Sequence, residues 1–160
     1  MPNWCQNQLT VTGATPEFRA WLKHGFSFQR MKAVSLPKTR HETADDSWRR
    51  SEACHAAWGT KWDVDDNAQR PIADELLETG SASFDTAWSP PLKTIAALSR
   101  KFPKVYFQLH YCELGMCFAG TARFHGGACH TESCQDHAGV MRMARDIFGY
   151  EEEDEEEPGE

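Results

Sequence analysis

Hydrophobic and polar residues alternate with the two-residue period of a β-strand in four parts of the chain. In the first of them Leu9 and Val11 share one face, and Gly13 ends the pattern. The last two are joined around residues 113–115 and predict a hairpin. A turn that leads into a fifth, short strand is expected at residues 58–63. The predicted strands are residues 3–12, 58–63, 81–88, 105–112 and 116–124.

Elsewhere, hydrophobic residues recur at the helical spacings of three and four. Thr15 provides a cap and Pro16 a first helical residue for a helix that ends near Gly25. A second helix begins near Ser89 and ends at Pro103. The predicted helical segments are residues 15–25, 89–102 and 137–148, with a short helix from residue 45 and a helical turn or connector within 66–80.

The order of these elements defines the predicted fold. The first six read β-α-β-β-α-β, the pattern of a ferredoxin-like sandwich whose helices cover one face of an antiparallel sheet. We therefore expect a single α+β ferredoxin-like domain over residues 1–150, with an insertion at about residues 26–70. An extra C-terminal strand and helix follow the six elements, and residues 151–160 form an acidic tail.

The negative charge of the chain is concentrated at its end. Asp and Glu number 24 against 17 Lys and Arg, which gives a formal net charge of −7. Residues 151–160 hold eight of the acids and no base, so the rest has 16 acids against 17 bases, a net of +1. This balance does not favour a general nucleic-acid binder, which carries an excess of Lys and Arg.

The composition excludes several classes of protein. With 40% hydrophobic and 11% aromatic residues, the chain is neither disordered nor fibrous. No apolar run approaches the ~18 residues that a membrane span needs, and the first residues carry no visible secretory signal. We therefore expect a cytoplasmic protein whose six cysteines are free thiols.

Five short strings stand in a characteristic order along the chain. They are Pro2-Asn3-Trp4-Cys5 with Asn7 and Leu9, residues 58–63 (WGTKWD), residues 84–91 (FDTAWSPP), Tyr111 with Glu113 and Gly115, and residues 118–120 (FAG). Over about residues 2–125 the chain resembles the YubB ferredoxin-like domain family, Api-like proteins of bacteriophages and conjugative plasmids. The resemblance implies a ferredoxin-like fold and a mobile-element origin in a bacterial host, and it brings no activity or catalytic residue with it.

The segment that follows Gly127 is rich in Cys and His. Thiolates and imidazoles are the usual tetrahedral ligands of Zn²⁺. Their Cys-x4-Cys spacing departs from the common Cys-x2-Cys, and Cys112 and Cys117 could contribute further ligands. The alternative is a polar loop with ordinary thiols. The candidate zinc ligands are Cys129, His130, Cys134 and His137.

Two features predict contact with a partner protein. Trp58, Lys61 and Trp62 stand in a polar, turn-rich segment, where they form either a binding patch or a structural plug at the strand ends. The acidic tail either keeps the protein soluble or occupies a basic groove of a partner that normally holds nucleic acid. The candidate tail contacts are Glu151, Glu152, Glu153, Asp154, Glu155, Glu156 and Glu157.

These features favour a non-enzymatic phage or plasmid accessory protein that binds a host protein, in the concrete form of a counter-defence inhibitor that mimics nucleic acid. The chain carries none of the common catalytic motifs, so we predict no catalytic residue and, apart from the zinc, no cofactor. One alternative is a small zinc-binding or thiol-dependent protein that uses residues 125–137. Another is a single-stranded nucleic-acid-binding module on the open sheet face, where Tyr106, Gln108 and His110 share one side. Direct nucleic-acid binding is disfavoured, because that face offers a single aromatic residue.

Overall fold

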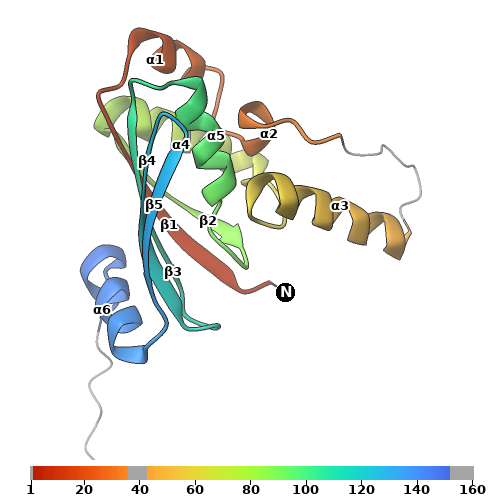
Figure 1. Ribbon diagram of the computed structural model, residues 1–160, viewed down its shortest axis with the longest axis vertical. Coiled ribbons are helices and arrows are strands. Elements are labelled where there is room, and N and C mark those ends of the chain that lie inside the picture. The colour runs from red at the N-terminus through yellow and green to blue at the C-terminus, as the bar shows by residue number, and fades with distance from the viewer. Residues whose placement is uncertain (1, 36–42, 152–160) are drawn as a thin grey trace, which may run out of the picture.

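The computed structural model describes residues 2–35 and 43–151, which fold around a five-stranded antiparallel sheet with the strand order β2-β1-β3-β4-β5 (Figure 1). β2 and β3 flank β1 and are connected through a helix, which gives the split β-α-β unit of ferredoxin-like folds. β3, β4 and β5 then follow one another as neighbouring antiparallel strands. The strands are β1 (Trp4–Thr12), β2 (Ser81–Ala87), β3 (Tyr106–Glu113), β4 (Phe118–His125) and β5 (Ala128–Cys134).

Helices cover the two faces of the sheet unequally (Figure 1). α1, α2, α4 and α5 enclose the main core on one face, and α6 packs alone on the other face against β3 and β4. α3 extends away from the sheet and buries only Cys54 and Trp58, towards its C-terminal end. The helices are α1 (Pro16–Leu22), α2 (Phe28–Met31), α3 (Ala44–Trp58), α4 (Asp66–Thr79), α5 (Leu92–Lys101) and α6 (His137–Phe148).

Most of the predicted elements are present. The strands expected at residues 3–12, 81–88, 105–112 and 116–124 are confirmed to within two residues, and an antiparallel β3–β4 pair surrounds the expected turn. At the start of α1 the hydroxyl oxygen of Thr15 accepts the backbone N–H of Phe18 at 3.3 Å, as predicted for a helix cap. Among the described residues no helix is both long enough and apolar enough to cross a lipid bilayer.

Two parts of the predicted sheet are wrong. Residues 58–63 form no strand, because Trp58 is the last residue of α3 and Gly59, at φ +82°, ends that helix. The strand missing from the prediction is β5, in the Cys/His-rich segment. It lies at the edge of the sheet with nearly all of its side chains exposed, so it has no hydrophobic alternation that would reveal it.

The helices between α1 and β2 are longer than the sequence predicts. α3 has 15 residues and begins with a capping box, in which the side chains of Thr43 and Asp46 each accept the other's backbone N–H. α4 has 14 residues and ends at Gly80, which adopts a left-handed conformation with φ +77°. α4 is not a mere connector, since it packs along β2 and buries Ile72 and Leu76.

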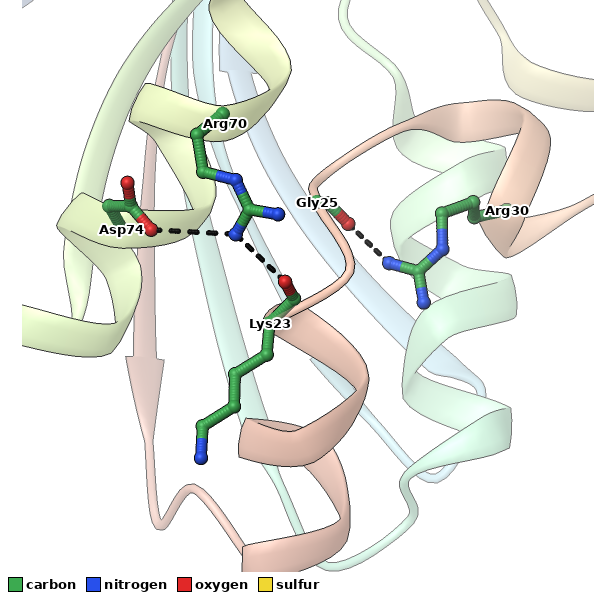
Figure 2. A network of polar contacts seen from close by, with 5 residues as sticks. All are labelled: Lys23, Gly25, Arg30, Arg70 and Asp74. Atoms are coloured by element: carbon green, nitrogen blue, oxygen red, sulfur yellow. Dashed lines mark hydrogen bonds and ion pairs between the residues drawn. The ribbon is translucent and has the colours of Figure 1, made fainter.

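Two arginines brace the turn between α1 and α2 (Figure 2). The guanidinium of Arg70 donates to the carbonyl oxygen of Lys23 at 2.8 Å and lies 3.6 Å from the carboxylate of Asp74. Arg30 donates to the carbonyl oxygen of Gly25 from the other side. These contacts tie the end of α1 to α4, and thereby position the helix that borders the candidate site described below.

Gly120 of β4 lies opposite Tyr111 of β3 and is covered by the Tyr111 ring. A Cβ atom at residue 120 would lie 2.7 Å from the backbone oxygen of Glu132 and closer still to the tyrosine ring. Because β5 cannot move away without losing its pairing, we expect Gly120→Ala to lower the free energy of unfolding by about 2 kcal/mol in urea denaturation. Gly126→Ala is the control, since open space surrounds that position and only its positive φ costs about 1 kcal/mol. Equal losses for the two variants would contradict the packing argument.

Candidate functional site: the groove beside the edge strand

A hollow of about 710 Å³ runs along β2, an edge strand of the sheet. α4 forms one wall, β2 forms the other, and the segment between α3 and α4 closes one end together with the first residue of β1. We call this hollow the edge groove. It is lined by Trp4, Trp62, Asp63, Val64, Asp65, Ala68, Pro71, Ile72, Glu75, Ser83, Phe84 and Asp85.

Two tryptophans form the closed end of the edge groove. The ring centroids of Trp4 and Trp62 lie 6.2 Å apart with an angle of 64° between the planes, an edge-to-face contact. Both rings remain well exposed, at 47% for Trp4 and 39% for Trp62. The Lys61 ammonium lies 5.0 Å from the Trp62 ring centroid, within the range of a cation–π contact. The pair therefore offers an exposed aromatic surface, and one of its rings already lies beside a cation of the same chain.

The charges that line the edge groove are all negative. Four carboxylates line it and no lysine or arginine does. The carboxylate of Asp63 has a structural role, because its oxygens accept the backbone N–H groups of Phe28, Gln29 and Val64. The burial that accompanies these bonds raises the pKa of Asp63.

Asp85 of β2 differs from Asp63 because nothing neutralises it. Within the described residues its carboxylate has neither a hydrogen-bond partner nor an ion pair, and the same holds for the carboxylate of Glu75 on α4. Partial desolvation against the groove walls raises the pKa of Asp85, with no nearby cation to oppose it. An unpaired, partly desolvated carboxylate beside exposed indole rings is a favourable environment for a bound cation.

The predicted binding patch at residues 58–62 divides into two parts. Trp62 lines the edge groove, and Lys61 lies beside its ring without lining the groove. Trp58 is only 2% exposed, and its indole N–H donates to the carbonyl oxygen of Lys32 at 2.7 Å. Trp58 therefore belongs to the core, which agrees with the structural alternative for this residue and gives no support to a direct role in partner binding. Sequence reasoning did not place Trp4 in the site, and it grouped Asp85 with the tryptophans without giving it a role, since each becomes significant only through its neighbours in space.

The four predicted zinc ligands are not brought together. Cys129 lies opposite the buried Phe124, so its side chain projects to the face of the sheet that holds the main core. The side chains of His130 and Cys134 project to the other face, on which α6 packs. His130 and Cys134 are also four residues apart along one strand, a separation of about 13 Å. His137 lies on α6. No group of three or more His, Cys, Asp or Glu residues in the described part of the chain could hold a metal ion, so the geometry does not support the predicted site.

The sheet face opposite the main core presents polar side chains beside α6. Tyr106, Gln108 and His110 share this face, as predicted, and β4 adds His125, whose ring stacks on that of Tyr106 at 4.0 Å and 2°. His110 lies within 2.9 Å of the Gln108 amide nitrogen and 2.7 Å of the Thr121 hydroxyl. Burial lowers the pKa of His110, and the positive charge of Arg123 lowers it further. The open face thus carries hydrogen-bonding groups together with the exposed, charged Arg123, which lies opposite Gln108.

Of the acidic tail, only Glu151 belongs to the described residues. Glu151 is exposed. The remaining predicted tail contacts, Glu152, Glu153, Asp154, Glu155, Glu156 and Glu157, lie outside the described residues.

An antiparallel sheet with a split β-α-β unit and helices packed on its faces makes the chain an α+β protein of the ferredoxin-like class. The family model described as the ferredoxin-like domain in Api92-like protein matches residues 57–158. The chain belongs to this family, in agreement with the resemblance seen in its sequence. No curated protein and no solved structure matches it.

Proposed function

We propose that the protein is a non-enzymatic binding protein that holds a basic segment of another protein in the edge groove. The observation that carries this proposal is the charge of the groove, which has four carboxylates, no lining base and an exposed tryptophan pair. A cationic side chain placed there would gain both a carboxylate partner and an aromatic face. The groove holds no arrangement of nucleophile, base and oxyanion donors that would favour catalysis.

The acidic tail supports the same choice of partner. Residues 151–160 add eight negative charges to a chain whose groove is also negative. Long-range attraction by such a segment speeds association with a basic partner and weakens with salt. The likeness to phage and plasmid proteins supports a biological form of the proposal, in which a mobile element inhibits a basic, nucleic-acid-binding protein of its bacterial host.

The proposal is tested with two labelled peptides, one of alternating Lys and Thr and one of alternating Glu and Thr. We expect the full-length protein to bind the Lys peptide and not the Glu peptide at low salt, as measured by fluorescence anisotropy. Asp85→Asn is expected to weaken binding about fivefold, because one half-exposed charge pair contributes about 1 kcal/mol. Asp74→Asn is the matched control, since that carboxylate faces Arg70 and lies outside the groove. Equal binding of both peptides, or equal effects of the two substitutions, would contradict the proposal.

Two further experiments test separately the role of the acidic tail and that of the open sheet face. A protein truncated after residue 150 is expected to lose affinity for the Lys peptide by more than about tenfold at low salt, and by much less at high salt. A single-stranded oligonucleotide serves as the third probe. Oligonucleotide binding that Tyr106→Ala abolishes, with no peptide binding, would favour the second candidate function, a nucleic-acid-binding module built on the stacked Tyr106 and His125.

A further inference from the structure

The outer edge of β2 exposes an interrupted row of backbone hydrogen-bonding groups. The N–H of Val11 donates to the carbonyl of Gly80 at 2.7 Å, and the N–H of Trp88 donates to the carbonyl of Asn3 at 2.8 Å. These bonds fix the antiparallel pattern, so even-numbered residues of β2 turn their N–H and C=O groups towards β1. Odd-numbered residues of β2, from 81 to 87, turn theirs outward.

Two threonines satisfy the ends of this outer row. The Thr79 hydroxyl accepts the N–H of Ser81 at 3.2 Å and also lies 2.9 Å from the Ser81 carbonyl oxygen. At the other end the Thr60 hydroxyl donates to the carbonyl of Ala87 at 2.8 Å. A sheet edge is normally protected in such ways against further pairing.

The middle of the row is left open. The N–H and C=O groups of Ser83 and Asp85, and the N–H of Ala87, have no partner within the described residues. Ser83 and Asp85 are exposed and both line the edge groove. The unpaired backbone groups and the unpaired carboxylate of Asp85 therefore occupy the same place.

We propose that an extended segment of the partner pairs with β2 at Ser83 and Asp85 as a sixth strand, and that this segment alternates cationic residues with small ones such as Thr. The inference rests on the proposed function and specifies how the partner is held. Side chains of an added strand alternate between the two faces of a sheet. Those on the face of Asp85 and Trp4 meet a carboxylate and an indole, which favour a cation, and those on the other face meet Ile72 of α4.

The charge on β2 argues against a second copy of this chain as the occupant. Pairing of two β2 edges centred on the open row would bring two Asp85 carboxylates close together across the new strand pair. Like charges in such positions destabilise a sheet. The same carboxylate would stabilise a segment that carries Lys or Arg, so the edge discriminates in favour of a cationic partner.

The test uses the alternating Lys and Thr peptide in two N-methylated forms, which carry methyl groups on odd or on even backbone nitrogens. Only one of these sets can face β2, because successive N–H groups of a strand point to opposite edges. We expect one form to lose affinity for the full-length protein by at least about tenfold and the other to bind nearly as the unmodified peptide. Equal affinities for both forms, or equal losses, would overturn strand addition, because methylation would then act through something other than pairing to one edge.

Hydrogen exchange provides the second readout. With the unmodified peptide bound, the amides of Ser83, Asp85 and Ala87 are expected to exchange more slowly, whereas those of Ala82 and Phe84 already face β1 and change little. Binding of the Lys peptide without this pattern would remove the inference and leave the proposed function standing. Absence of any binding by the Lys peptide would remove the proposed function itself.

Discussion

Replacing Trp58 with alanine is expected to lower the free energy of unfolding by about 4 kcal/mol. The ring is among the largest fully buried side chains, and its centroid lies 6.0 Å from that of Phe28. Its indole N–H donates to the carbonyl of Lys32, so truncation also removes this hydrogen bond. The measurement is urea denaturation followed by circular dichroism. Trp58→Phe separates the two causes, since it keeps most of the packing and should cost about 1–2 kcal/mol through the lost hydrogen bond.

Trp62→Ala is the matched control for this prediction. Trp62 is 39% exposed and belongs to the edge groove, so its loss should change stability by about 0.5 kcal/mol or less. It should instead weaken binding of the Lys peptide, whereas Trp58→Phe should leave that affinity unchanged. A stability loss for Trp58→Ala below about 1 kcal/mol would show that the helix end is not held by this ring. Reduced peptide affinity in Trp58→Phe would restore the predicted role of Trp58 in binding.

The elements that the sequence predicts well are those with a local physical signal. β1 has alternating faces, α1 has the Thr15 cap followed by Pro16, and the β3–β4 pair has its turn at residues 113–115. In that turn the Glu113 carboxylate accepts the N–H groups of Gly115 and Met116, both at 2.7 Å. Each of these signals lies within a few residues of the structure that it specifies, and hence it can be recognised without a tertiary contact.

The wrong predictions arose where tertiary contacts decide the structure. The segment at residues 58–63 has the aromatic content of a strand. However, Trp58 is buried in the core as the last residue of α3, and Gly59 ends that helix and changes the direction of the chain. β5 forms because β4 offers a partner, although its own side chains remain outside the core. α4 has a local cap at each end, Asp65 and Gly80, but the packing of its buried face against β2 is a tertiary contact that the sequence alone does not show.

The edge groove could not be predicted, because its parts come from distant places in the chain. Trp4 opens β1, Trp62 follows α3, and Asp85 stands in the middle of β2. All three residues belong to strings that carry the family resemblance, at residues 2–5, 58–63 and 84–91. The sequence thus contained the residues of the site, but only the pairing of β1 with β2 and the packing of α4 bring them into one hollow.

Two buried thiols are expected to make the protein unstable in alkaline solution. Burial raises the pKa of Cys5 to about 12 and that of Cys112 to about 11, from an ordinary value of 9.0. As the pH rises above about 9, each thiol ionises in the unfolded chain first, so the stability that neutral burial provides is present below that pH and is lost above it. Each pH unit then costs about 1.4 kcal/mol per thiol, and the two together remove about 5 kcal/mol by about pH 11. This loss is comparable to the whole stability of a small domain.

The measurement is urea denaturation from about pH 8 to about pH 11 with a reductant present, which keeps all six thiols reduced. Cys5→Ala should reduce the slope of stability against pH by about half, because one of the two raised thiols is removed. Cys129→Ala is the matched control, since that side chain is exposed and its replacement leaves both buried thiols in place. An undiminished slope in Cys5→Ala would show that this thiol is not responsible for the alkaline loss. Tyr111, whose pKa is also raised by burial, would then be the next group to replace, because an acid held neutral in the folded state contributes with the same sign.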